Sequence, residues 1–150
     1  SRREGQAAGL MPIQLTIVTP EGVRFEGPVD RVVVPGTEGD FGVLPGHGRL
    51  LSPVRIGELQ LETPGSNGNW AAVSDGFAEV SGDKVVLMVD SCEFATDIDA
   101  ARAERARARA ASELELLKAR KNDESMFRME EAALHRALIR LQVAAKHRSI

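Results

Sequence analysis

Short apolar runs separated by turn residues fill the first two thirds of the chain. The runs are rich in β-branched residues, and nearly all of the glycines and prolines stand between them. They cover residues 13–18, 29–34, 41–44, 49–56, 58–62, 70–74, 77–80 and 84–89. Runs of this length at this spacing predict the antiparallel strands of a sandwich or barrel. No crossover helix interrupts them, so a parallel sheet is not expected.

At Thr96 the hydrophobic period changes from two to about 3.6, and glycine and proline are absent from there to Ile150. The acids Asp97 and Asp99 suit the start of a helix, which we expect to run to about residue 121. After a turn at residues 122–125, a second helix follows. Two helices with so short a connection predict an antiparallel hairpin. The expected stripes are Ala103, Ala106, Ala110, Leu114 and Leu117 on the first helix and Phe127, Leu134, Leu138, Leu141 and Ala145 on the second.

The two predicted helices share only a small apolar interface. Alanine facing leucine buries little apolar area, and two helices alone have few other contacts. Met129, Ile139 and Val143 lie away from the main stripe of the second helix, so a further face needs a partner. We therefore expect the hairpin to dock on the strands, and a weakly docked element can be released at modest cost.

The change of pattern predicts three segments. Residues 1–10 have no hydrophobic period and precede Met11, which suggests a tag or a disordered tail; residues 11–95 form the β-sandwich domain, and residues 96–150 form the hairpin. Hydrophobic residues make up 43% of the chain, enough for a core, and the net charge of −3 gives no general attraction to nucleic acid or an anionic membrane. One cysteine, Cys92, excludes an internal disulfide.

The motifs do not indicate an enzyme. The glycine-rich stretch 36–48 lacks the Gly-Lys-Ser/Thr of a phosphate loop, and no helix is predicted to follow it. His47 in that stretch has no metal ligand at a suitable spacing. No serine stands in a Gly-x-Ser-x-Gly context. A structural loop whose glycines adopt positive φ is the simpler interpretation.

The arginines of the helical segment allow two interpretations. Arg102, Arg105 and Arg109 share one face of the first helix, and Arg136 and Arg140 stand one turn apart on the second. They either form a solvated face or bind an external anion. The solvated face would use glutamates as partners, namely Glu104, Glu113, Glu130 and Glu131. An anion site is favoured by Arg136 and Arg140, which have no carboxylate three or four residues away.

Several segments together resemble one known family. They are Thr-Pro-Glu-Gly at 19–22, Gly-Asp-Phe-Gly-Val-Leu-Pro-Gly-His at 39–47 with the leucines at 50–51, Gly-Phe-Ala-Glu-Val at 76–80, and Ile-Asp-Ala-Ala-Arg-Ala at 98–103. In this order they resemble the epsilon subunit of the rotary F-type ATP synthase, of the bacterial type. The resemblance runs from Met11 to about Lys146 without large gaps.

This resemblance implies a ten-stranded β-sandwich followed by a two-helix hairpin, acting as a non-catalytic rotor subunit. It implies that the sandwich binds the gamma subunit and the ring of c subunits, with Asp40 and His47 as c-ring contacts. The hairpin either folds on the sandwich or extends along gamma into the alpha/beta hexamer, where it blocks ATP hydrolysis. Such a chain reaches the membrane only through the complex, on the cytoplasmic face of a bacterial membrane or the stromal side of a thylakoid.

In some bacterial members of that family the folded hairpin also binds ATP. ATP is then a regulatory ligand that favours the folded state, and no cofactor is required. The matching positions here are Glu93, Asp99, Arg102, Arg109, Arg136 and Arg140. A stand-alone nucleotide-sensing module is the alternative function. A small phosphohydrolase is a more distant one, because no metal-binding carboxylate cluster accompanies the arginines.

Overall fold

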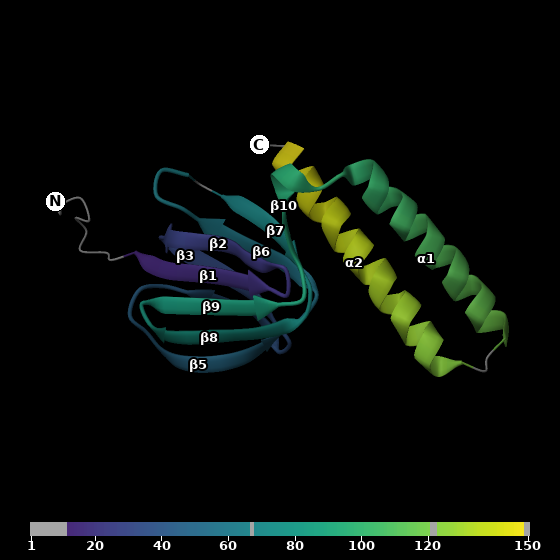
Figure 1. The fold of residues 1–150 in the computed structure, drawn as a ribbon, viewed down its shortest axis with the longest axis horizontal. Coiled ribbons are helices and arrows are strands. Elements are labelled where there is room, and N and C mark those ends of the chain that lie inside the picture. Colours follow the sequence, from purple (N-terminus) through teal and green to yellow (C-terminus); the bar gives the residue numbers. More distant parts are fainter. Residues whose placement is uncertain (1–11, 67, 121–122, 149–150) are drawn as a thin grey trace.

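The period-two runs form a ten-stranded β-sandwich, and the two helices that follow lie against one side of it (Figure 1). The computed structural model describes residues 12–148 with the exception of 67, 121 and 122. This architecture confirms the predicted fold class. The segment 1–10, predicted to be a tail, lies outside the described residues. The strands are β1 (Ile13–Thr19), β2 (Gly22–Val29), β3 (Arg31–Gly36), β4 (Gly39–Val43), β5 (His47–Val54), β6 (Gly57–Glu62), β7 (Asn69–Val73), β8 (Gly76–Gly82), β9 (Lys84–Val89) and β10 (Cys92–Phe94).

The hydrogen-bonded order of the strands is β10-β7-β6-β3-β5-β8-β9-β1-β2, and β4 pairs with β3. All pairs are antiparallel except β1 with β9, in which Gln14–Val18 run alongside Lys84–Met88 in the same direction. A single parallel pair is compatible with the absence of crossover helices, because the strands β2 to β8 themselves connect β1 to β9.

Alternation along the strands builds the core. Ile13, Leu15 and Ile17 of β1 are fully buried, whereas Gln14 between them is exposed. The two edge strands meet across the sandwich, since the rings of Phe25 on β2 and Phe94 on β10 are 6.1 Å apart at their centroids. These contacts join the buried aliphatic side chains into one hydrophobic core.

The apolar runs did not mark two of the ten strands that the resemblance implies. The expected run 29–34 is divided at Asp30, where β2 ends and β3 begins, and most of β2 precedes that run. Val23, Phe25 and Val29 of β2 alternate with Arg24 and Glu26, but Gly27 and Pro28 interrupt the run with residues typical of turns. The other missed strand, β10, has only three residues, too few to show a period.

Each helix begins at an aspartate. Helix α1 (Ala100–Arg120) follows a short 3₁₀ turn (Ala95–Asp97), and the backbone N–H of Arg102 donates to Asp99 Oδ1 at 3.1 Å. Helix α2 (Glu124–Arg148) begins after Asp123, whose Oδ1 accepts a hydrogen bond from the Met126 N–H at 2.9 Å. These are N-cap bonds. The predicted turn at 122–125 is therefore too long, because Glu124 and Ser125 already belong to α2.

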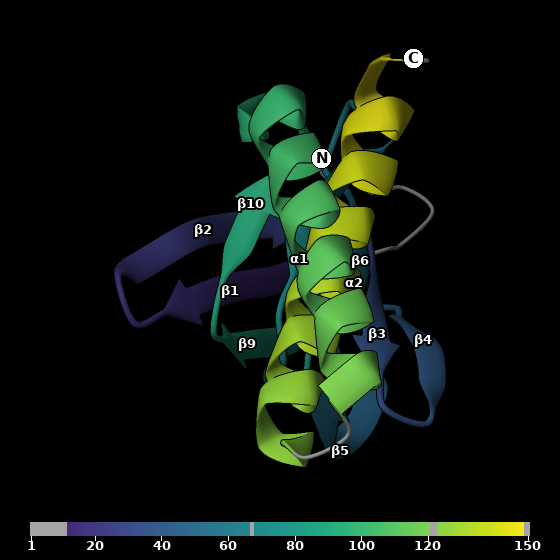
Figure 2. The ribbon, with the colours of Figure 1, turned by 90° about the vertical axis from the view of Figure 1, so that its right-hand side faces the viewer.

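Helix α2 lies between α1 and the strands, and the hairpin crosses one side of the sandwich (Figure 2). The apolar stripe of α1 is confirmed at Ala103, Ala110, Leu114 and Leu117, which are buried. On α2 the predicted stripe is partly wrong: Leu138 is 39% exposed and Ala145 is exposed. The buried residues are Ala137, Ile139, Val143 and Ala144. A helix covered on two sides buries small residues wherever the neighbouring backbone comes close.

Candidate functional site

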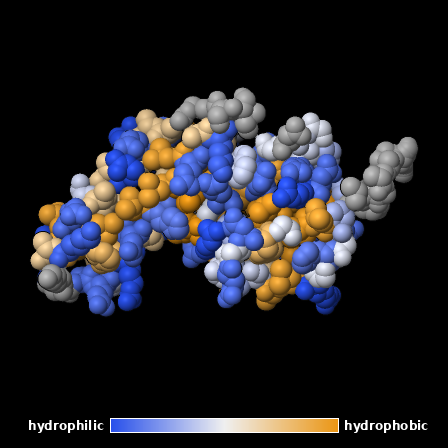
Figure 3. All heavy atoms as spheres, turned by 180° about the vertical axis from the view of Figure 1, so that it is seen from behind, coloured by the Kyte–Doolittle hydropathy of each residue, from blue (hydrophilic) through white to orange (hydrophobic). Residues whose placement is uncertain are grey.

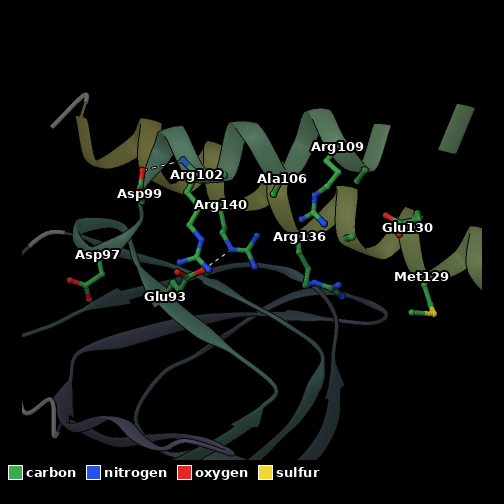
Figure 4. Close-up of a pocket in the computed structure, with 13 residues that line it drawn as sticks. Glu93, Asp97, Asp99, Arg102, Ala106, Arg109, Met129, Glu130, Arg136 and Arg140 are labelled. Carbon is green, nitrogen blue, oxygen red and sulfur yellow. Dashed lines mark hydrogen bonds and ion pairs between the residues drawn. The ribbon is translucent and has the colours of Figure 1, made fainter. Parts of the chain in front are cut away.

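A cavity of about 430 Å³ lies between the two helices and the strand that precedes them. It takes its walls from α1, from α2 and from β10 with the adjoining 3₁₀ turn (Figure 4). The residues that line it include every position that the resemblance assigned to ATP, namely Glu93, Asp99, Arg102, Arg109, Arg136 and Arg140. Asp97, Met129 and Glu130 also line it.

Regular secondary structure holds each of the charged side chains in place. Arg102 and Arg109 are seven residues apart on α1, which brings them onto one face two turns apart. Arg136 and Arg140 stand one turn apart on α2. Glu93 lies on β10, opposite Ala72 of β7. Figure 4 shows the four arginine side chains pointing from the helices toward the strands.

One of the four arginines is already paired. Arg140 Nε donates to Glu93 Oε1 at 2.6 Å, and both side chains are partly buried. Glu93 and Arg140 are 47 residues apart in the chain. The helical spacing of three or four residues therefore could not reveal this partner. The pair joins α2 to β10 and is one of the contacts that hold the hairpin on the sandwich.

The other three arginines of the cavity have no such partner in the part of the chain that the structure describes. Among the residues that the structure describes, no carboxylate lies within 4.0 Å of the guanidinium nitrogens of Arg102, Arg109 or Arg136. The arrangement supplies planar donors suited to phosphate or carboxylate oxygens.

The glutamates proposed for a solvated face do not pair with these arginines. Glu104 instead accepts hydrogen bonds from Arg107, with a shortest distance of 2.6 Å, and these bonds lower the pKa of Glu104. Glu130 lines the cavity without an ion pair among the described residues. The described geometry therefore favours the interpretation as an anion site over the interpretation as a paired surface.

The cavity has the size of a small-molecule site and few features of a catalytic one. Its volume falls within the range of about 300–1,000 Å³ typical of ligand pockets. In the described part of the chain, no group of three or more His, Cys, Asp and Glu side chains is arranged to hold a metal ion. The arginines of the cavity can neutralise the negative charge of a bound anion.

The loop around β4 holds the other two predicted contact residues. Asp40 forms an ion pair with Arg55, whose Nε also donates to Gly36 O at 3.0 Å. His47 begins β5, beyond the turn that follows β4, and its Nδ1 lies 2.8 Å from Gly48 O. Asp40 thus lies within β4 and His47 at the start of β5, and the described geometry shows no hydrogen bond or ion pair between them. Leu44 and Leu51 are exposed near this turn.

Sequence reasoning missed an apolar row on the outer face of the sandwich. The strand registers align Pro53, Phe77, Met88, Val18 and Val23 across β5, β8, β9, β1 and β2. The side chains of Phe77, Met88 and Val23 are 51%, 47% and 58% exposed. Apolar residues at outward positions of alternating strands were the available signal. In Figure 3, hydrophobic surface gathers on the sandwich and on the hairpin.

An open hollow of about 400 Å³ lies beside Met88 and Val18 of that row. Val18, Met88 and Val89 line it together with the acidic residues Asp75 and Asp90. Exposed apolar surface with a charged rim is typical of a surface that binds another protein.

The fold and the two surfaces define a class of protein: a β-sandwich that carries a docked helical arm and is built for binding. The comparisons with known proteins agree. The family model of the ATP synthase delta/epsilon chain, β-sandwich domain, matches residues 12–95. The ATP synthase epsilon chain of Geotalea uraniireducens is 42% identical over 134 residues, which cover 89% of this chain and 94% of the relative. The epsilon chain of Halalkalibacterium halodurans is 39% identical, covering 89% and 98%.

A solved structure has the same fold. It is a chain from the mitochondrial ATP synthase of Euglena gracilis, in an assembly of OSCP, F1 and c-ring, with a TM-score of 0.74 and 24% identity over 89% of this chain and 81% of that one. This protein therefore belongs to the ATP synthase epsilon chain family, and such a chain is a non-catalytic stalk subunit of a larger complex. Among the described residues, neither helix is long and apolar enough to cross a bilayer.

Proposed function

We propose that this chain is a regulatory subunit of the central stalk, in which the sandwich is the anchor and the hairpin is an ATP-sensing arm. The observation that carries the proposal is the convergence of Arg102, Arg109 and Arg136, without carboxylate partners among the described residues, on one cavity. Residues 11–95 and 96–150 act as separate units in this scheme. ATP acts as a regulatory ligand, and the chain itself performs no chemistry.

The cavity depends on docking. Its walls come from α1, α2 and β10, and Glu93 on β10 contacts Arg140 on α2. When the hairpin leaves the sandwich, β10 and the helices separate and the cavity is lost. A polyphosphate that binds the three arginines therefore has higher affinity for the docked state, and it shifts the population toward that state by this difference in affinity.

The sandwich supplies two surfaces for the rest of the rotor. The apolar row from Pro53 to Val23 suits a large, mainly apolar interface with the gamma subunit. The loop that contains Asp40 and His47, with Leu44 exposed between them, suits the ring of c subunits. The chain then reaches the membrane only through that ring, at the cytoplasmic face in a bacterium.

Release of the hairpin is the inhibitory step in this proposal. The freed helices extend along gamma into the alpha/beta hexamer and block ATP hydrolysis there. A reconstituted complex that lacks residues 96–150 should keep gamma and should hydrolyse ATP faster than the complete complex. An unchanged hydrolysis rate, with gamma still bound, would refute the inhibitory role.

Calorimetry with ATP tests the nucleotide site. The double variant Arg136→Ala with Arg140→Ala should bind ATP at least about tenfold more weakly than the wild type, since charge-assisted hydrogen bonds contribute about 1.5–3 kcal/mol each. The matched control is Arg107→Ala with Arg128→Ala, which removes two exposed arginines that pair within their own helices. Equal binding by the two double variants would exclude the arginine cavity as the site.

A stand-alone nucleotide sensor is the second candidate, because the described cavity is built entirely from this one chain. Pull-down with the gamma subunit separates the two functions. The variant Phe77→Asp, with Met88→Asp, should lose gamma and keep ATP if the rotor function is correct. A wild-type chain that binds ATP and does not bind gamma would support the stand-alone sensor.

A further inference from the structure

One face of α2 makes the contacts that dock the hairpin. Arg136, Ile139, Arg140, Val143 and Lys146 follow the spacing i, i+3, i+4, i+7 and i+10, so they lie along the same side of the helix. The two apolar members are buried in a small cluster with side chains of the sandwich and the 3₁₀ turn. The cluster also contains Ala72, Ala95, Ile56, Trp70 and Ile98. Along the stripe the two arginines alternate with the two apolar residues, and the lysine follows at the C-terminal end.

The lysine contacts two strands at once. Lys146 Nζ forms an ion pair with Glu58 Oε1 on β6 and lies 3.9 Å from the centroid of the Trp70 ring on β7. In the β6–β7 ladder Glu58 stands opposite Ala72 and Gln60 opposite Trp70. Glu58 and Trp70 are therefore diagonal neighbours on one face of the sheet, and Lys146 reaches both.

This contact combines a partly shielded ion pair with a cation–π contact. The Glu58 side chain is 20% exposed and that of Lys146 is 40% exposed, so water screens their attraction less than that of two fully exposed charges. The ammonium group over the face of a tryptophan gains a cation–π attraction, for which tryptophan is the best partner. Trp70 is the only tryptophan of the chain.

We propose that Glu58, Trp70 and Lys146 form a latch that holds the hairpin on the sandwich in the absence of nucleotide. None of the three lines the arginine cavity. The latch therefore sets the resting balance between docked and released hairpin, and a ligand in the cavity adds its own effect to that balance. This inference concerns docking alone, and it holds whether or not the cavity binds ATP.

A buried reporter thiol measures release even when release is rare. Ala72→Cys places a small side chain on β7 beneath α2, where Ala72 is 7% exposed and shares a cluster with Ile139 and Val143. A thiol reagent reaches that position only when the hairpin leaves, so under rapid redocking the labelling rate is proportional to the released fraction. The native Cys92 serves as an internal control, because burial raises its pKa to about 12 and keeps it unreactive.

The test compares full-length variants in the Ala72→Cys background without nucleotide. Lys146→Met keeps the aliphatic stem and loses the charge, and it should label roughly fivefold faster, the combined effect of a cation–π contact and an ion pair. Lys146→Arg keeps both contacts and should label at nearly the parent rate. The matched control is Lys118→Met, which removes an exposed lysine paired within α1.

Glu58→Gln separates the two parts of the latch. It removes the ion pair and leaves the ring, so labelling should be roughly twofold faster and less sensitive to salt than in the parent protein. Equal labelling of Lys146→Met and Lys118→Met would overturn the proposal. It would also be overturned if Lys146→Met accelerated the labelling of Cys92 equally, because the substitution would then act on unfolding of the sandwich.

Discussion

The sandwich and the docked hairpin are held together by different kinds of contact. The interior of the sandwich is an unbroken cluster of aliphatic side chains, many of them fully buried. The hairpin docks through two buried aliphatic side chains, Ile139 and Val143, with the ion pairs of Arg140 and Lys146 on either side. Apolar area buried in a core is costly to expose, whereas ion pairs and a small cluster separate at modest cost. In the proposed function, this difference lets the sandwich act as the anchor and the hairpin as the moving part.

The largest effect is expected from a cavity in the sandwich core. Leu59 is fully buried on β6, and Leu59→Ala should lower the free energy of unfolding by about 2–5 kcal/mol. Urea denaturation followed by circular dichroism measures the loss. Leu116→Ala on the exposed side of α1 is the control and should change stability by less than about 0.5 kcal/mol. Equal losses would show that the sandwich core is no more tightly packed than the hairpin surface.

A polar group in the docking cluster should separate the two parts. Val143 is fully buried between α2 and the sandwich. Val143→Asn places an amide without a partner there, which should disfavour docking by about 2 kcal/mol. Small-angle scattering should show an extended molecule, while the chemical shifts of the β1 and β9 amides stay unchanged. Loss of those sandwich signals would contradict the independence of the anchor.

A smaller effect is expected at the start of α1. Asp99→Ala removes the acceptor for the Arg102 N–H and should reduce the stability of the hairpin by about 1 kcal/mol. Amide exchange in the first turn of α1 reports the change. Asp99→Asn keeps a capping side chain and should exchange at nearly the parent rate. Faster exchange in both variants would assign the effect to the charge of Asp99 and not to its cap.

The smallest effect is expected for the exposed pair of Glu104 and Arg107. Hydrogen bonds from Arg107 lower the pKa of Glu104, so the contribution of the pair is present above about pH 4.5 and is lost as the pH falls through the lowered value. Because both side chains lie in solvent, Glu104→Gln should leave the unfolding midpoint at pH 7 unchanged within error. A clear shift of that midpoint would mean that surface ion pairs contribute more to the stability of the hairpin than the apolar interface between its helices does.

The elements with a regular period could be predicted from the sequence. Period two located the core strands, and the change at Thr96 located the hairpin. Strand β2 contains Gly27 and Pro28, which are typical of turns, and β10 has only three residues, so the apolar runs did not mark these two strands. On α2 the pattern predicted buried leucines, whereas the structure buries Ala137 and Ala144. The sequence does not show how closely a neighbouring helix approaches, so it could not favour the smaller side chains.

The site was less accessible to sequence reasoning. Helical spacing placed Arg136 and Arg140 on one face of the second helix. The full group of candidate ATP-binding residues, which includes Glu93, came only from the family resemblance. The pair of Glu93 and Arg140 spans 47 residues, and the contact of Lys146 with Glu58 spans 88. Such distant pairs depend on how α2 lies across β6, β7 and β10. The apolar outer row likewise depends on the registers of five strands.

The parallel pairing of β1 with β9 has a consequence for how the chain is made. Gln14 aligns with Lys84, 70 residues later, so β1 has its inner neighbour only after most of the sandwich has left the ribosome. Contacts so distant in sequence form slowly, and domains fold as units during synthesis. The hairpin follows the sandwich in the chain and emerges after it. The strands β6 and β7, on which the hairpin docks, are synthesised before it. The hairpin can therefore dock on a sandwich that has already folded.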